Sequence, residues 1–184
     1  SAELSLLRRK SVRYVFQDPI LALSPRMKVR TQLSLSTEGR TDDQALIDAL
    51  AMAGLDNPKE ILDFYPHQLS VGMAQRVCIA MATLPAPALL IADEPTSAVD
   101  ASLRYKLLDL LMSIQRDRGM SMILITHDID IARRYGERIM VMYAGRIVEL
   151  ADRTDFFTQQ LHPYSKLLIL THSDSSTPVA SPVL

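Results

Sequence analysis

The fold is decided by the stretch Ala88-Leu89-Leu90-Ile91-Ala92-Asp93-Glu94-Pro95-Thr96-Ser97-Ala98-Val99-Asp100. Its apolar residues run without alternation, which is typical of a strand buried on both faces of a parallel sheet. Two adjacent carboxylates, Asp93 and Glu94, follow at the carboxyl end of this predicted strand, where open α/β sheets bind their ligands. Because an isolated buried charge is costly, the two acids favour a metal ion and a reacting water over a plain capped turn. The stretch therefore predicts nucleotide–magnesium chemistry.

A second apolar run, Met122–Ile125, ends just before His127. It also reads as a strand buried on both faces. Between the two runs, apolar residues recur at helical spacing from Leu103 to Ile114, with Ser102 as the expected N-cap. A strand, a helix and a second strand form a crossover that favours a parallel sheet. His127 is therefore expected at the same sheet edge as the two acids.

The composition excludes several classes of protein. A chain of 184 residues suits one domain with a subdomain, and no apolar run approaches the ~18–20 residues that span a bilayer. The formal net charge of −1 provides no global field that would attract nucleic acid or anionic lipid. The single cysteine, Cys78, excludes an internal disulfide, and its apolar helical surroundings predict a buried, inert thiol.

Residues before the central stretch divide into a strand, a loop and a helical insert. Val12–Phe16 is β-prone. Pro19 and Pro25 bracket a loop, so we expect residues 17–30 to be a functional or hinge segment rather than an element. Residues 40–65 are expected to be helical, with Thr41 as the N-cap of the first helix.

A further helix is predicted to begin near Met73, with Ser70 as its N-cap. The Ser-Val-Gly turn at its start combines free backbone N–H groups, the positive end of the helix dipole and a hydroxyl, which together suit an anion. Serine caps without an anion are common, so this turn alone does not distinguish a simple cap from an anion site.

The last part of the chain is expected to hold a β-hairpin, with strands at Arg138–Tyr143 and Arg146–Leu150 joined by a Gly-containing turn. A helix is expected at residues 154–160, followed by a short segment that ends at Leu170. From His172 onward the sequence is rich in serine, threonine, proline and small residues, and we expect it to be disordered.

Several motifs occur together in a fixed order: Gln17-Asp18-Pro19, Leu69–Arg76, Leu89–Glu94, Ser97–Asp100 and Thr126-His127-Asp128. In this order they resemble the ATP-binding subunit of an ABC transporter, over most of residues 10–150. The run from His162 to Leu168 is similar to the tail of the subgroup that serves oligopeptide, dipeptide and nickel importers. The segment Phe16–Pro19, followed by Ser24 and Pro25, also resembles this subgroup.

The resemblance implies an α/β fold, the P-loop NTPase fold of an ABC-type ATPase domain. The domain is expected to be incomplete here, with a parallel sheet core and a helical subdomain but without the N-terminal P-loop part. The resemblance divides the chain into four parts. The end of the core with the glutamine loop covers 1–25, and a helical subdomain ending in the signature motif covers 26–72. The ATPase core with Walker B, D-loop and switch histidine covers 73–150, and a C-terminal extension covers 151–184.

By the same resemblance, Asp93 is the Walker B acid that holds Mg²⁺, and Glu94 is the general base that polarises the attacking water. His127 is the switch histidine that contacts the γ-phosphate of ATP. Gln17 reaches Mg²⁺ and the water, and it links the site to the membrane partner. Phosphoryl transfer needs this kind of positioning and charge neutralisation more than covalent chemistry.

The family signature binds ATP held by the opposite subunit, which makes catalysis depend on closure of two subunits. Asp100 resembles the D-loop aspartate at the dimer interface. The residues that resemble the signature are Ser70, Val71, Gly72, Met73 and Gln75.

Two departures from the family pattern carry expectations. The 184 residues contain no G-x-x-x-x-G-K-[ST] motif, so we expect a C-terminal portion of such a subunit that does not hydrolyse ATP alone. Val71 stands where the signature usually has glycine, and a β-branched residue adopts a positive φ only at a cost. The phosphate contact at Val71 is expected to be weakened unless its backbone has ordinary dihedral angles.

The resemblance implies a subunit that binds and hydrolyses ATP with Mg²⁺ and energises uptake of peptides or nickel-type solutes. Its partners are transmembrane permease subunits, a second ATP-binding subunit and, indirectly, a periplasmic or extracellular solute-binding protein, with no nucleic acid. It implies a cytoplasmic location, peripheral on the inner face of the cell membrane. We expect a short cytoplasmic helix of the permease to bind a groove formed by Pro19–Met27 and adjacent helices.

Two alternatives stay open. One is a soluble ABC-type ATPase that acts on DNA or ribosomes, which the lack of long coiled coils and of a basic balance disfavours. The other is a non-hydrolytic regulatory module that docks on a transporter. The missing P-loop motif favours this module, whereas the presence of Asp93, Glu94 and His127 disfavours it.

Overall fold

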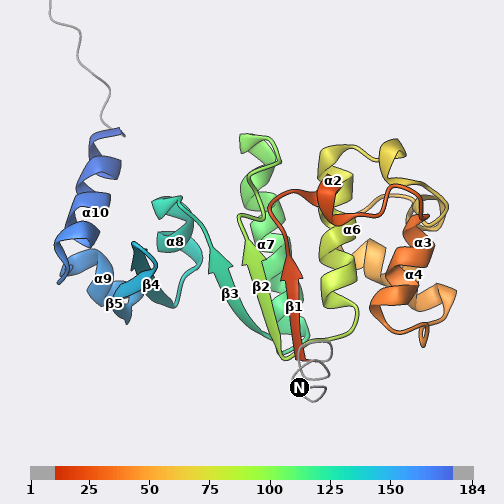
Figure 1. Ribbon diagram of the computed structural model, residues 1–184, viewed down its shortest axis with the longest axis horizontal. Helices are drawn as coiled ribbons and strands as arrows, with labels where there is room; N and C mark the ends of the chain where they lie inside the picture. Colours follow the sequence, from red (N-terminus) through yellow and green to blue (C-terminus); the bar gives the residue numbers. More distant parts are fainter. Residues whose placement is uncertain (1–10, 176–184) are drawn as a thin grey trace, which may run out of the picture. The chain divides into compact units, whose positions relative to one another are not determined.

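The structure is a computed structural model that describes residues 11–175 (Figure 1). The disorder predicted for residues 176–184 falls outside this range. The chain divides into two compact units, Ser1–Ile125 and Thr126–Leu184, and each is described by itself. Over the described residues, no helix is long and apolar enough to cross a membrane.

The first unit is built on a three-stranded parallel sheet with the order β1-β2-β3. The predicted crossover is confirmed, because the two apolar runs form adjacent parallel strands joined by a helix. Figure 1 shows the three strands side by side and pointing the same way. The strands are β1 (Val12–Val15), β2 (Leu89–Asp93) and β3 (Ser121–Ile125).

Burial of the strands differs from the expectation of two covered faces. In β2, Leu90 and Ala92 are fully buried, whereas Ile91 is only partly covered. In β3, Ile123 and Ile125 are 48% and 46% exposed, so the prediction of burial on both faces is wrong for this strand. The physical reason is that α7 packs on the other face of the sheet, whereas the register places Ile123 on the same face as the partly covered Ile91 and the exposed Tyr14.

The crossover helix α7 (Ala101–Asp117) packs its apolar stripe on the sheet, with Leu107, Leu111 and Ile114 in the same core as Leu90. The expected cap is wrong by two residues, since the helix begins after Asp100 rather than after Ser102. Leu103 continues the same helix face four residues before Leu107, but on the first turn of the helix it is 41% exposed, so the expected buried stripe begins one turn later.

A helical insert separates β1 from β2. Its longest helix, α6, contributes residues to two cores: Val77 and Cys78 pack within the insert, while Ile79 and Ala82 pack against the sheet. The helix therefore forms a wall shared by the insert and the sheet. The elements of the insert are α2 (Pro19–Ala22), α3 (Val29–Ser36), α4 (Asp43–Met52), α5 (Pro58–Ile61), the 3₁₀ helix η1 (Pro66–Gln68) and α6 (Val71–Thr83).

Two expectations for the insert are wrong. The predicted loop at 17–30 contains α2 and the start of α3, because the Asp18 carboxylate accepts the N–H groups of Ile20 and Leu21 at 2.9 and 3.1 Å and so caps a short helix. The cap of α4 is Asp42 rather than Thr41, since Asp42 Oδ1 accepts the free N–H of the first turn at 2.9 Å.

The second unit is a β-hairpin covered on one face by helices. The predicted hairpin is confirmed, and its turn residues Ala144 and Gly145 both have positive φ, as a tight hairpin turn requires. Phe156 fills the core at 1% exposure. The last helix continues to Ser175, so the disorder predicted from His172 is wrong for these four residues. The elements are α8 (Ile129–Tyr135), β4 (Arg138–Tyr143), β5 (Arg146–Asp152), α9 (Arg153–Thr158) and α10 (Pro163–Ser175).

A buried carboxylate anchors the start of α10. Glu149 of β5 is 7% exposed and accepts the backbone N–H groups of Leu161 and His162 at 2.9 and 3.0 Å. Burial alone raises the pKa of a carboxyl group, but these hydrogen bonds outweigh it, and the pKa of Glu149 lies below its ordinary value.

Replacing this carboxylate is expected to destabilise the second unit in a pH-dependent way. Since the folded-state pKa is lowered, the ionised group stabilises the fold above the ordinary glutamate pKa, and this contribution is lost as pH falls through the folded pKa. We expect Glu149→Gln to lower the free energy of unfolding by about 1–2 kcal/mol at pH 7. The difference from wild type should shrink below about pH 4. Denaturant titrations at pH 7 and pH 3 measure this, with the exposed Glu137→Gln as the control; a pH-independent difference would contradict it.

Candidate functional site

The carboxyl edge of the sheet gathers three of the predicted site residues. In the parallel register Val15 pairs with Ala92, and Asp93 pairs with Ile125, so the three strands end at one level. Asp93 is the last residue of β2, and Glu94 follows it directly; both are partly buried. Gln17 follows β1 by two residues and is exposed. The edge therefore presents two acids and one amide on neighbouring strand ends.

Glu94 has an unusual backbone. Its φ is +46°, in the left-handed region that a residue with a side chain adopts at a cost of roughly 1–2 kcal/mol. Its N–H donates to the carbonyl of Ile125 on β3 at 3.0 Å, which extends the β2–β3 ladder by one residue. Its carbonyl accepts the N–H of Ser97 at 3.1 Å and the Ser97 hydroxyl at 2.9 Å. Strain of this kind, held by surrounding bonds, is a feature of functional sites.

The start of α6 holds the other group of predicted residues. Ser70 Oγ accepts the N–H of Met73 at 3.2 Å, which confirms Ser70 as the N-cap. Gly72 has no heavy atom within 4 Å of the place where a Cβ would stand, so the backbone of this turn is open to an incoming group. Val71 is the first helical residue and keeps an ordinary φ, so the strain expected from its β-branched side chain is absent.

Two of the remaining predicted residues have contrasting surroundings. Gln75 is fully buried, and neither atom of its side-chain amide has a hydrogen-bond partner among the described residues. Asp100 is exposed at the N-cap position of α7, where its carboxylate makes no capping hydrogen bond. Asp100 is therefore available to another group, whereas Gln75 faces the protein interior.

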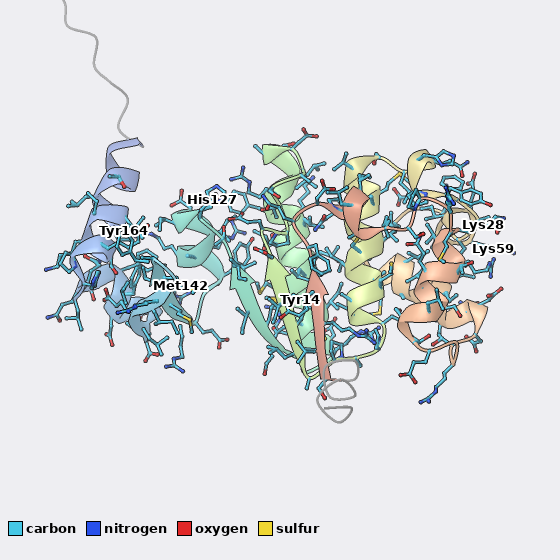
Figure 2. All side chains as sticks on the ribbon, viewed as in Figure 1. Tyr14, Lys28, Lys59, His127, Met142 and Tyr164 are labelled. Atoms are coloured by element: carbon cyan, nitrogen blue, oxygen red, sulfur yellow. The ribbon has the colours of Figure 1, made fainter. Side chains whose placement is uncertain are left out.

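His127 belongs to the second unit and is exposed. It lies in the turn between β3 and α8, where Thr126 Oγ1 accepts the N–H of Asp128 at 3.0 Å. Asp128 in turn caps α8 through the N–H groups of Asp130 and Ile131. Figure 2 labels His127 at the start of this unit. Its position relative to Asp93 and Glu94 stays a prediction.

The donor set at the sheet edge suits Mg²⁺ with a phosphate ligand. Among residues 11–175, no group of three or more histidine, cysteine or acidic side chains could hold a metal ion by itself. Mg²⁺ is commonly bound through one or two carboxylates with the remaining positions filled by waters and substrate phosphates. Asp93, with the nearby amide residue Gln17, fits that pattern.

A largely apolar pocket of about 500 Å³ lies between β1, α3 and α6. The rings of Tyr14 and Phe16 stack along it with centroids 5.9 Å apart, and Figure 2 labels Tyr14 on β1. Cys78 lines it and is buried, as predicted, and burial raises the pKa of this thiol to about 12. The apolar side chains that line the pocket include Val12, Met27, Leu35 and Met81.

Sequence reasoning missed one residue beside this pocket. Gln32 of α3 is 5% exposed; its side-chain oxygen accepts the N–H of Ser24, and its amide donates to the carbonyls of Ser24 and Met27, at 2.8 to 3.1 Å. These bonds fix the turn Ser24–Met27, which follows α2. A polar residue between apolar neighbours at helical spacing gave no signal of this role.

A family profile described as "ABC transporter" matches residues 3–97. The chain belongs to the ABC transporter family.

Solved structures of this class share the fold. A dimeric post-hydrolysis structure of the ATP-binding cassette MJ0796, bound to ADP and Pi, aligns with a TM-score of 0.70 at 30% identity, covering 83% of this chain and 67% of that one. The structure of cbiO1 from Clostridium perfringens, described as part of the ABC transporter complex cbiONQ, aligns with a TM-score of 0.73 at 29% identity, covering 87% and 64%. The predicted α/β cassette fold is confirmed.

Curated relatives come from peptide transport systems. The dipeptide transport ATP-binding protein DppD of Bacillus subtilis is 40% identical over 173 residues, which are 91% of this chain and 52% of the relative. The oligopeptide transport ATP-binding protein OppD of Lactococcus lactis subsp. cremoris is 36% identical over 181 residues, which are 95% and 53%. The chain spans about half the length of the curated relatives it matches.

Proposed function

We propose that the chain is part of an ATP-hydrolysing subunit that energises peptide uptake through an ABC transporter. The observation that carries the proposal is the acid pair Asp93–Glu94 at the carboxyl edge of the sheet, with Glu94 held in a left-handed backbone. The names of the similar proteins support peptides as the solute, since they are dipeptide and oligopeptide transport ATP-binding proteins.

In this proposal each residue has a role that follows from its position in the fold. Bound ATP and Mg²⁺ supply the reactive γ-phosphate and the cation that neutralises its charge. Asp93 and Gln17 hold the cation, and Glu94 accepts a proton from the attacking water. His127, in the turn that follows β3, contacts the γ-phosphate. The open turn at Ser70–Met73 offers N–H groups and a hydroxyl to the phosphate of ATP on a second subunit, with Asp100 at the same interface.

Two of the predicted nucleotide contacts differ in what supports them. Gly72 leaves its backbone open, which supports a phosphate contact there. Gln75 points into the interior, so its part in nucleotide binding requires a movement of α6 or an effect through packing. Both assignments stay proposals.

The permease is proposed to dock on the pocket beside β1. The pocket is mostly apolar and lies next to α2 and the Ser24–Met27 turn, which follow Gln17 along the chain. An apolar groove of this kind takes the apolar face of a short helix. The subunit would lie on the inner face of the cell membrane and work with a second ATP-binding subunit and a solute-binding protein.

An ATPase assay on the assembled transporter in proteoliposomes tests the proposed function. Dipeptides or oligopeptides, presented with the solute-binding protein, are expected to stimulate ATP hydrolysis and to accumulate across the membrane. Nickel salts serve as the competing solute. Peptide-independent hydrolysis without peptide transport would overturn the proposal for peptides.

The docking proposal predicts an effect of charge reversal on the turn Ser24–Met27. Arg26 is exposed on this turn, so Arg26→Glu is expected to leave the free energy of unfolding within about 0.5 kcal/mol of wild type. Peptide transport per ATP hydrolysed should fall, because the permease contact is altered. Lys59→Glu on α5, labelled in Figure 2, is the matched control on another exposed surface. Normal coupling in the Arg26 variant would count against this docking site.

A further inference from the structure

Ser97 closes the turn that follows β2. It lies three residues after Glu94 and is exposed. Its backbone N–H and its hydroxyl both donate to the Glu94 carbonyl, at 3.1 and 2.9 Å. The N–H bond is that of an ordinary four-residue turn, with Pro95 as its second residue, but the hydroxyl adds a second donor to the same oxygen. Two donors from one residue therefore fix the orientation of one peptide group.

The peptide group at the Glu94 carbonyl follows a strained residue. The φ of +46° at Glu94 is unfavourable for a residue with a side chain. Such a backbone persists only where the surroundings determine it more strongly than the local preference. On the amide side, the N–H of Glu94 is held by Ile125 of β3 at 3.0 Å. On the carbonyl side, Ser97 donates both its N–H and its hydroxyl to the Glu94 oxygen, so this serine helps to hold the backbone from which the Glu94 side chain leaves.

The same hydroxyl reaches a second carbonyl. Ser97 Oγ lies 3.5 Å from the backbone oxygen of Gln17, which is 80 positions away in the sequence. A hydroxyl has one proton to donate, and here the shorter distance gives it to Glu94. The segment after β1 and the acid after β2 therefore meet at one side chain. A movement of Gln17 toward Ser97 would compete for the proton that holds the Glu94 carbonyl.

We propose that Ser97 is a positioning residue, which orients Glu94 for proton transfer and makes that orientation respond to the segment carrying Gln17. This inference rests on the proposed function, because it assigns Glu94 the role of general base. Ser97 itself touches neither the water nor the phosphate in this assignment. Its effect passes through the backbone of Glu94.

Kinetics of Ser97→Ala and Ser97→Thr on the assembled transporter test the role. Losing one hydrogen bond of about 1 kcal/mol from the transition-state geometry predicts that Ser97→Ala lowers kcat about five- to tenfold. The KM for ATP should stay within about twofold, because substrate binding does not use this hydroxyl. Ser97→Thr keeps a hydroxyl and is expected to restore kcat to within about twofold of wild type. A purely structural role would not produce this split between kcat and KM with rescue by threonine.

The control removes a bond of the same type elsewhere in the unit. Thr37 Oγ1 donates to the carbonyl of Ser34, three residues earlier, at 3.0 Å, so Thr37→Ala should leave kcat unchanged. If Ser97→Ala has the kcat of wild type while Glu94→Gln abolishes hydrolysis, the positioning role is overturned and the proposed function stands. If Glu94→Gln retains hydrolysis, the proposed function is overturned, and the role of Ser97 is overturned with it.

Discussion

Glu94→Gln is expected to lower the steady-state rate of ATP hydrolysis by the assembled transporter at least about 100-fold. The substitution keeps the shape of the side chain and its hydrogen-bonding atoms, but an amide cannot accept the proton of the attacking water at neutral pH. Binding of ATP should persist, because the proposed phosphate contacts and the proposed cation ligand Asp93 are unchanged. Phosphate release measures the first expectation, and retention of labelled ATP measures the second.

The matched control is Glu60→Gln, since Glu60 is an exposed acid on α5 outside the sheet edge. It should hydrolyse ATP at the rate of wild type. A Glu94→Gln variant whose rate stays within about tenfold of wild type would contradict the assignment of the general base. If the variant loses both ATP binding and hydrolysis, Glu94 would instead be one of the residues that bind ATP.

Gln32→Leu is expected to lower the free energy of unfolding of the first unit by on the order of 2–4 kcal/mol. Leucine is close to glutamine in size, so the loss comes from hydrogen bonds and not from a cavity. The Ser24 N–H and the Met27 carbonyl would lose their partner in a partly buried position, and an unsatisfied buried group costs about 1–3 kcal/mol. Urea unfolding measures this loss. Peptide transport should fall as well, since the turn at which the permease is proposed to dock loses the hydrogen bonds of Gln32.

Two further variants sharpen this prediction. Gln44→Leu removes an exposed side-chain hydrogen bond to Asp48 on α4 and should change stability by less than about 0.5 kcal/mol. Gln32→Glu places an anion against two carbonyl oxygens, and protonation of that group at low pH restores one donor. Its deficit relative to wild type should therefore shrink as pH falls from 7 to 5. If the Gln32→Leu variant is as stable as wild type, the turn Ser24–Met27 does not depend on the hydrogen bonds of Gln32.

The sheet and its acidic edge could be predicted because their signals are local. Uninterrupted apolar runs mark buried strands, and a helix-length connection between them favours parallel pairing. These rules place Asp93 and Glu94 at a carboxyl edge without any knowledge of the rest of the fold. They do not report which face of the sheet is covered by another element, so the exposure of Ile123 and Ile125 on β3 has no signal in the sequence.

Hydrogen bonds from side chains to the backbone are the features that the sequence predicts least well. Asp18 caps α2 in a segment whose prolines indicate a loop, and Asp42 takes the cap that Thr41 could equally have provided. Gln32 binds the carbonyls of the turn that directly precedes α3, and nothing in the residue types of that turn indicates these bonds. The positive φ of Glu94 has no composition signal either, since a glutamate is not a residue that favours this region.

The helix α6, with the insert on one side and the sheet on the other, has a mechanical consequence. Its 13 residues span roughly 20 Å, and both flanks are packed, so it transmits displacement like a rigid rod rather than bending. A push on the insert at the proposed docking site of the permease would shift the whole helix, including its Ser70 end. The distance between that end and a nucleotide on a facing subunit would then report, at long range, whether the partner is engaged.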